Sequence, residues 1–265
     1  MFSKEALQHL TDHSTPFVDV SAKDSKSQLL AHPSSVSISS LEKFQPRPNR
    51  ISQALSLASV ASFCEYIERF GCGDTSIFLD VERGHFHAAL DYHGQGAPRW
   101  VQHKAVFNPQ DSLQWRKWYG IHNNPINQVA LAHFIEANIN DIVEPEPGQV
   151  LLAALDFQAN EKLALGSSMS LDDGSVKFSF TKDNVVKNVT FPHRIRIEIP
   201  IYENEGKTSL EVRIRYKLDG DGALVFIVSL VRDPLSILRA ELLDIAQIIR
   251  EDCAGKHVYE GNLGR

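Results

Sequence analysis

A chain of 265 residues, 43% of them hydrophobic, is long enough to bury a sizeable core in one large domain or two small ones. Its formal net charge of −6 argues against a protein that coats duplex DNA, so any contact with nucleic acid must be local. Three cysteines without paired spacing favour a reducing compartment. The sequence has neither a secretion signal nor an apolar run that spans a bilayer. We therefore expect a cytoplasmic protein without a membrane partner.

Residues 1–40 differ in composition from the rest of the chain. They contain ten serines, scattered charges and few large apolar side chains, a composition that cannot form its own core. We interpret this segment as an extended N-terminal arm. Such an arm becomes ordered by packing on its own subunit or on a neighbour, so we also expect a homo-oligomer.

Residues 41–148 predict an N-terminal α+β part. Ser56 or Ser59 begins a helix with one apolar face, and Gly71 is expected to end it in a left-handed conformation. An antiparallel meander follows, with strands expected at residues 77–82, 85–93 and 102–107. Two further helices are predicted: a short one with a capping box that starts at Asp111, and one over residues 125–143.

Residues 149–265 predict a C-terminal antiparallel sheet with a closing helix. A helix is expected over residues 149–165, followed by strands at residues 168–171, 176–181, 194–202, 209–218 and 223–231. Asp233 and Pro234 begin the closing helix. Its apolar stripe consists of Leu235, Leu238, Leu242, Ile245 and Ile249. The fold class is therefore α+β, with antiparallel β-sheets packed by helices, a long C-terminal helix and an extended N-terminal arm.

Two neighbouring segments alternate charged and apolar residues with the period of a β-strand, so one face of the sheet that they form should be apolar and the other cationic. The cations are Arg194, Arg196, Arg213, Arg215 and Lys217. Guanidinium groups suit phosphate oxygens, so this face is a candidate site for single-stranded nucleic acid or a nucleotide. The interleaved Glu198 and Glu211 favour the competing interpretation, in which cross-strand ion pairs form the solvent-facing side of an ordinary sheet.

A second candidate is an aromatic and basic patch formed by Trp115, Arg116, Lys117 and Trp118. Aromatic rings beside cations can stack on bases and hold phosphates. At helical spacing, however, tryptophans more often anchor a helix in the core, and we favour that interpretation.

The third candidate is a metal site of His85, His87, Asp91 and His103. Imidazole and carboxylate groups are ligands of zinc and iron, provided that three or four of them converge on one point. Alternating histidines also occur on exposed strand faces, and we favour that interpretation over a metal. The spacing alone does not decide whether these side chains converge.

Several short motifs occur in an order that resembles the YfdQ-like proteins, a domain of unknown function encoded by bacteriophages and prophages. The motifs are LEKFQPRP (Leu41–Pro48), LDYH (Leu90–His93), HKAVF (His103–Phe107), WRKW (Trp115–Trp118), AHFIE (Ala132–Glu136), RIRIEIPIY (Arg194–Tyr202), VRIRYKL (Val212–Leu218) and LVRDP (Leu230–Pro234). The resemblance runs from about Leu41 to the final helix and leaves the arm outside. It implies a phage or prophage gene that is expressed in a bacterial host cytoplasm, and it supplies no established catalytic residues.

No nucleophile elbow, phosphate-binding loop or dinucleotide fingerprint is present in the sequence. We therefore expect a non-enzymatic accessory protein without a cofactor. It should self-assemble and bind either a host defence protein or a nucleic-acid intermediate of phage replication or recombination. The alternative is a small metal-dependent enzyme that uses the His and Asp residues named above.

Overall fold

The computed structural model describes residues 42–158, 166–169, 176–182, 185–218 and 224–263, together with Lys4 and the short strands β1 (Val18–Asp19) and β2 (Leu30–Ala31). The predicted arm, residues 1–40, therefore lies almost entirely outside the described residues. The chain divides into two compact units, Met1–Ile51 and Ser52–Arg265. In the first unit, β1 pairs with β2 in antiparallel orientation, and a 3₁₀ turn, η1, covers Glu42–Phe44.

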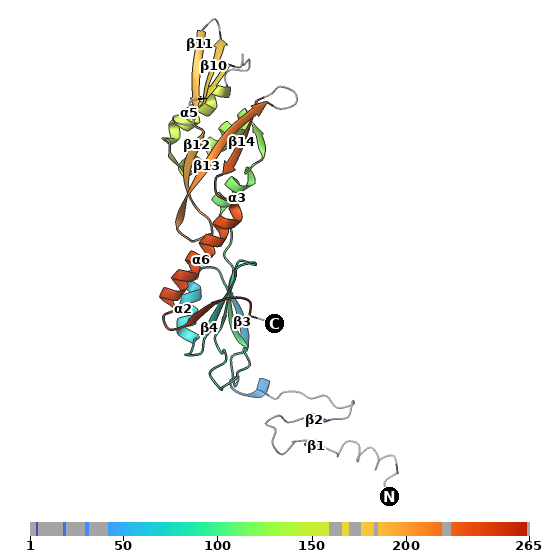
Figure 1. The fold of residues 1–265 in the computed structure, drawn as a ribbon. Coiled ribbons are helices and arrows are strands. Elements are labelled where there is room, and N and C mark those ends of the chain that lie inside the picture. Colours follow the sequence, from blue (N-terminus) through green and yellow to red (C-terminus); the bar gives the residue numbers. More distant parts are fainter. Residues whose placement is uncertain are drawn as a thin grey trace. The chain divides into compact units, whose positions relative to one another are not determined.

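The second unit begins with a five-stranded mixed sheet, called the first sheet below (Figure 1). Its strands, in spatial order, are β15 (His257–Glu260), β4 (Ser76–Asp80), β5 (His85–Ala89), β6 (His103–Phe107) and β3 (Gln53–Leu57). The antiparallel meander β4–β5–β6 is confirmed. The two outer strands were not predicted, and both are parallel to their neighbours.

Helix α2 (Val60–Phe70) packs against the first sheet through an aromatic core. Ser59 caps the helix by accepting a hydrogen bond from the Ser62 N–H, as predicted. The ring of Phe63 lies 6.5 Å from that of Phe86 and 6.0 Å from that of Phe107, measured between centroids. Gly71 ends the helix with a φ of −73°, so the predicted left-handed conformation is wrong. Glycine is needed here because a Cβ would collide with the Ile67 carbonyl oxygen.

A second five-stranded sheet, called the second sheet below, is antiparallel throughout. Its strands, in spatial order, are β7 (Pro125–Asn127), β14 (Leu224–Leu230), β13 (Lys207–Leu218), β12 (Arg194–Pro200) and β8 (Ile142–Glu144). The helical pattern predicted one helix over residues 125–143, a range that covers β7 and most of β8. The structure replaces that helix by β7, α4 (Gln128–Ala137), a 3₁₀ turn η2 (Ile139–Asp141) and β8.

The alternating pattern of β12 and β13 gives the second sheet one apolar face. Its side chains are buried: Ile195, Ile197, Ile199, Leu210, Val212, Ile214, Phe226 and Val228. Helices α3 (Leu113–Gly120), α4 and α5 (Pro147–Gln158) contact β12, β14 and β8 and contribute their own buried residues to this core. Ser112 caps α3 by accepting from the Trp115 N–H, so the predicted cap at Asp111 is displaced by one residue.

Three further strands, β9 (Gly166–Met169), β10 (Val176–Lys182) and β11 (Val185–Phe191), form an antiparallel sheet in the order β11–β10–β9. The sequence predicted β9 and β10 but not β11. Asp219, Gly220, Asp221 and Gly222 have the composition of a tight turn between β13 and β14, and they lie outside the described residues. Both five-stranded sheets combine strands from either side of residue 148, where composition suggested a division of the chain.

The closing helix α6 (Pro234–Asp252) begins as predicted. Asp233 caps it by accepting from the Ser236 N–H, and Pro234 occupies its first turn. The helix contacts α2 and β15, and its buried residues are Ile237, Leu242, Ile245, Ala246 and Ile249. Leu235 is 73% exposed, so the predicted stripe does not extend to the start of the helix. These elements confirm the α+β fold.

Glu241 of α6 should make stability depend on pH. Burial raises the pKa of its carboxyl, opposed by a hydrogen bond from Thr208 Oγ1 at 2.7 Å and reinforced by Asp244. The folded state therefore holds the proton more tightly than the unfolded state, so stability falls as pH rises from the ordinary value of 4.5 through the folded pKa. We expect Glu241→Gln to gain stability relative to the wild type between pH 4 and pH 7.

Urea unfolding of both proteins at the two pH values measures this effect. Glutamine keeps an oxygen that accepts from Thr208, so packing and hydrogen bonding change little. Glu65→Gln, a substitution of an exposed glutamate on α2, is the matched control. A stability difference between Glu241→Gln and the wild type that is the same at both pH values contradicts the prediction.

Candidate nucleic-acid interface

The face of the second sheet opposite its apolar core carries the predicted cations. β12 contributes Arg194, Arg196 and Glu198 to this face, and β13 contributes Glu211, Arg213, Arg215 and Lys217. The antiparallel register places Arg194 directly opposite Arg213 and Arg196 directly opposite Glu211. The structure thus brings the five predicted cations onto one surface, but their surroundings differ.

The two β12 arginines are held by carboxylates. Arg196 contacts the Glu144 carboxylate through Nη2 at 3.0 Å and Nε at 3.1 Å, and Glu198 lies 3.8 Å from its Nη1. Arg194 Nη1 lies 3.4 Å from Glu211 Oε2. Both partners of the Arg194–Glu211 pair are 55% exposed, so this pair contributes little, about 0–1 kcal/mol, and a competing anion can displace it. Arg196 is the more firmly held of the two.

The β13 cations have no carboxylate partner among the residues that the structure describes. Arg215 Nη2 donates a hydrogen bond to Ser229 Oγ at 3.2 Å, and Lys217 is exposed. Arg213 is only partly buried, yet its Nε is buried without a hydrogen-bond partner in the described part of the chain. We call Arg194, Arg213, Arg215 and Lys217 the cationic strip.

The imidazole of His193 reports the positive potential beside the cationic strip. Burial lowers its pKa below the ordinary value, and the charge of Arg213 lowers it further. Arg194 and Arg215 act in the same direction, whereas a hydrogen bond with the Ile214 backbone opposes the shift. Three arginines therefore act on one ring at the start of β12.

We expect Arg213→Ala to raise the pKa of His193, because it removes the arginine whose charge lowers this pKa the most. A titration of the imidazole proton signals by NMR measures the shift. His133, an exposed residue of α4, supplies an internal reference signal. If the pKa of His193 were the same in Arg213→Ala and the wild type, the strip would not create the potential inferred here.

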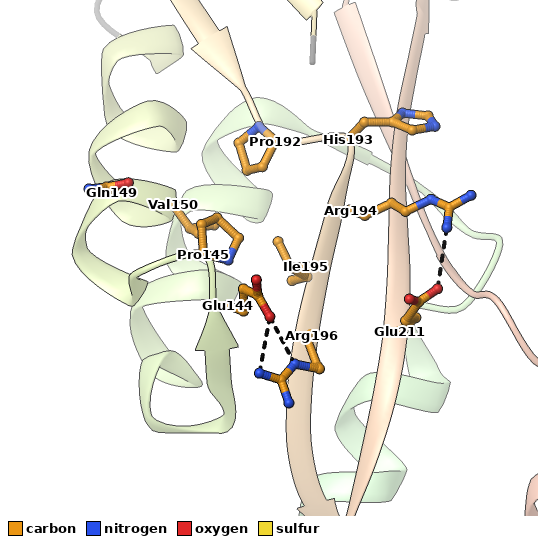
Figure 2. A pocket seen from close by; sticks show the side chains of 10 residues that line it. All are labelled: Glu144, Pro145, Gln149, Val150, Pro192, His193, Arg194, Ile195, Arg196 and Glu211. Carbon is orange, nitrogen blue, oxygen red and sulfur yellow. Dashed lines mark hydrogen bonds and ion pairs between the residues drawn. The ribbon is translucent and has the colours of Figure 1, made fainter. Parts of the chain in front are cut away.

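A cavity of about 710 Å³ adjoins the cationic strip, at the edge of β12 that faces β8 (Figure 2). We call it the β8–β12 cavity. Its lining comprises Glu144, Pro145, Gln149, Val150, Pro192, His193, Arg194, Ile195, Arg196 and Glu211. The strand alternation predicted the face that carries Arg194, Arg196 and Glu211. The lining residues from β8 and α5 were not predicted, because β8 lies in a segment that was predicted to be helical.

The aromatic and basic patch is not a surface for stacking bases. Trp115 is 1% exposed and Trp118 is 2% exposed, so neither ring is accessible. Trp118 Nε1 donates to Asp141 Oδ2 at 2.9 Å, and Lys117 Nζ donates to Asn138 Oδ1 at 3.1 Å. Arg116 lies 3.5 Å from Glu203. The interpretation of the tryptophans as core anchors fits this arrangement.

The four residues proposed as metal ligands are not brought together. His87 lies opposite Val106 and Phe86 lies opposite Phe107, so the register places His103 on the other face of the first sheet from His85 and His87. On that face, His103 Nε2 is hydrogen-bonded to Tyr66 Oη of α2 at 2.8 Å. The described residues contain no group of three or more His, Cys, Asp or Glu side chains arranged to hold a metal ion.

Asp91, the remaining candidate ligand, has a structural role. Its carboxylate accepts backbone hydrogen bonds from Gln102 at 3.0 Å and His103 at 2.9 Å, at the start of β6. His85 and His87 are neighbours, with ring centroids 4.4 Å apart. Burial lowers the pKa of His87, and the adjacent His85 lowers it further. This pair lies on a strand face without the other two predicted ligands.

Cys72 shows a contact that its sequence neighbours do not reveal. Arg99 Nη1 lies 3.2 Å from Cys72 Sγ, although 27 positions separate the two residues. Burial raises the pKa of the thiol, but hydrogen bonds from the Asp74 backbone, Arg99 and Thr75 outweigh this effect and lower it. The neighbours of Cys72 in the sequence include no cation, so this contact depends on the tertiary fold. Cys64, in contrast, is a buried residue of α2.

The fold and the surface together define an α+β protein with a cationic strip on the open face of an antiparallel sheet. The chain belongs to a family of uncharacterized conserved proteins, DUF2303, whose model matches residues 4–263. The match confirms that the chain belongs to a family of unknown function, and it extends into the arm that the motif resemblance left outside. No curated protein and no solved structure matches the chain. None of the helices in the described residues is long and apolar enough to cross a membrane.

Proposed function

We propose that this protein is a non-enzymatic, phage- or prophage-encoded accessory protein that acts in the bacterial host cytoplasm by binding single-stranded nucleic acid through its cationic strip. The phage context rests on the resemblance of its ordered motifs to the YfdQ-like proteins. The binding role rests on the chemistry of the second sheet. A host defence protein is the other class of target that this context implies, and the arrangement of arginines favours a phosphate backbone over it.

The observation that carries the proposal is the pairing of Arg194 with Arg213. Two like charges directly opposite one another destabilise a sheet, and a buried Nε without a partner adds a further cost. A phosphate oxygen between the two guanidinium groups would offset both costs through charge-assisted hydrogen bonds. Arg215 and Lys217 continue the same line of charge along β13.

The size of the cationic strip favours single-stranded nucleic acid over a duplex. From Arg213 to Lys217 it extends for about 13 Å along β13, given the rise of a β-strand. Acidic side chains flank it, and the chain as a whole carries a net charge of −6. The strip can therefore hold a few phosphates of a flexible strand, whereas the surrounding surface would repel a rigid duplex.

The test is the salt dependence of binding to a short, labelled oligothymidylate, measured by fluorescence anisotropy. With three to four phosphates neutralised, the logarithm of the binding constant should fall against the logarithm of salt concentration with a slope of about −2 to −3. A duplex of the same length should bind more weakly. Absence of binding to the single strand at low salt would refute the proposal.

We propose further that the protein self-assembles. The outer strands of the first sheet, β3 and β15, support this proposal because most of their residues are exposed and each has a backbone edge that no other described strand pairs with. Light scattering coupled to size-exclusion chromatography measures the mass directly. A strict monomer across the accessible concentration range would remove this part of the proposal.

A further inference from the structure

We infer that the β8–β12 cavity is a pocket for a nucleobase, and that the phosphate attached to this base is held at Arg194. The inference rests on the proposed function, because Arg194 belongs both to the cavity lining and to the cationic strip. It adds a recognition element that the strip itself lacks. The positive charge along β13 binds the phosphate backbone of a nucleic acid whatever its sequence. A cavity that admits a base, in contrast, distinguishes a nucleotide from a bare phosphate.

The apolar residues of the cavity lining lie on one side of β12 (Figure 2). On this side, which faces β8 and α5, Pro145, Val150, Pro192 and Ile195 lie together with Gln149 and the Glu144–Arg196 ion pair. On the side of β13, its walls are Arg194 and Glu211, with His193 beside them. A nucleotide has the same division, because a flat base with apolar faces is joined through a sugar to an anionic group.

The apolar side exists because β8 is short. β8 pairs with β12 only at Arg196 and Ile197, and the chain turns away from β12 at Pro145. Ile195 therefore borders a gap instead of a neighbouring strand. Val150 is 0% exposed and Ile195 is 2% exposed, so both belong to the core of the second sheet and support the wall from beneath. The apolar surface that a ligand can contact is that of Pro145 and Pro192, which are half-buried. A preformed wall lowers the entropic cost of binding a rigid base.

The volume fits an organic ligand better than an inorganic anion. Pockets for small organic molecules usually enclose about 300–1,000 Å³, a range that includes this cavity. A lone phosphate at Arg194 would leave the apolar side unused. Glu144 and Gln149 add polar groups to the lining, and these groups suit the polar edge of a base. Glu144 is positioned by its two contacts with Arg196.

The probes are nucleoside monophosphates and ribose 5-phosphate, which carries the same phosphate without a base. Isothermal titration with the full chain should show at least one nucleoside monophosphate binding about tenfold or more tightly than ribose 5-phosphate. Fluorescence anisotropy with labelled oligonucleotides gives a second readout, in which an oligothymidylate should bind more tightly than an abasic oligonucleotide of the same length. The first pair of probes tests a free nucleotide, and the second tests a nucleotide within a strand.

Two variants separate the cavity from the strip. Gln149→Trp, at an exposed position of the lining, should reduce nucleotide binding to the level of ribose 5-phosphate by filling the opening. The same substitution at exposed Gln247 of α6 is the matched control and should leave binding unchanged. Lys217→Ala, outside the cavity lining, should weaken strand binding but not binding of a mononucleotide.

The outcomes distinguish this inference from the proposed function. If ribose 5-phosphate binds as tightly as every nucleotide, and the abasic strand as tightly as the oligothymidylate, the base pocket is refuted while the phosphate-binding strip stands. If a nucleotide binds selectively but the oligothymidylate does not bind at low salt, the single-strand function is refuted. In that case the pocket stands, with a free nucleotide as its occupant.

Discussion

Reversing two charges of the cationic strip, in the double variant Arg213→Glu with Arg215→Glu, should abolish salt-sensitive binding to single-stranded DNA. The change replaces two potential phosphate contacts by two carboxylates and reverses the sign of the potential along β13. We expect the affinity for an oligothymidylate to fall by about a hundredfold or more at low salt. Fluorescence anisotropy over a salt series measures both the affinity and the slope.

The control for this variant must carry the same change in net charge at a distant place. Arg69→Glu with Arg250→Glu alters two exposed arginines, one on α2 and one on α6. At about 0.1 M salt in the same series, it should leave binding within about threefold of the wild type, since exposed charges farther apart than the Debye length of about 10 Å are largely screened. Equal losses in the two double variants would show that net charge, rather than the strip, governs binding. Circular dichroism shows whether each variant remains folded.

Removing the Trp115 side chain should produce the largest loss of stability among single substitutions in α3. The ring is 1% exposed and lies in the core of the second sheet, so Trp115→Ala leaves a large cavity. Substitutions of this kind cost about 3–5 kcal/mol in the free energy of unfolding. Urea unfolding followed by circular dichroism measures the difference.

Two further variants make the Trp115 prediction specific. Tyr119→Ala removes a ring that stacks on Trp115 at 5.7 Å but is 51% exposed, so we expect it to cost about 1 kcal/mol or less. Trp115→Phe should retain the fold and leave oligonucleotide binding unchanged. A marked loss of binding in folded Trp115→Phe would indicate that the indole takes part in recognition after all.

The sequence was most informative where local chemistry and pattern coincide. The alternation of Arg194–Tyr202 and Ser209–Leu218 predicted two strands and the face on which each side chain lies. Ser59, Asp233 and Pro234 marked helix starts correctly because capping depends on residues within one turn. These signals do not depend on the tertiary fold.

The predictions that failed concern features that depend on the tertiary structure. Ile126 and Ile142 fit the helical period of the segment between them, but both pair with strands of the second sheet. Nothing local distinguishes a three-residue strand from the end of an apolar helix. The cavity was missed for the same reason, because Pro145 and Pro192 meet only once β8 has paired with β12. The proposed metal site failed because sequence spacing does not specify which face of a sheet a residue from another strand occupies.

The parallel strand β15 has a consequence for how the protein is made. It pairs with β4, and Val258 lies beside Ile77, so the first sheet is completed only after the residues of the second sheet have been synthesised. The second sheet is encoded between these partners and can form earlier from its own strands. Contacts so distant in sequence slow folding. We therefore expect the edge of β4 to stay unpaired until β15 has been synthesised, which exposes a site for chaperone binding or misassembly on each nascent chain.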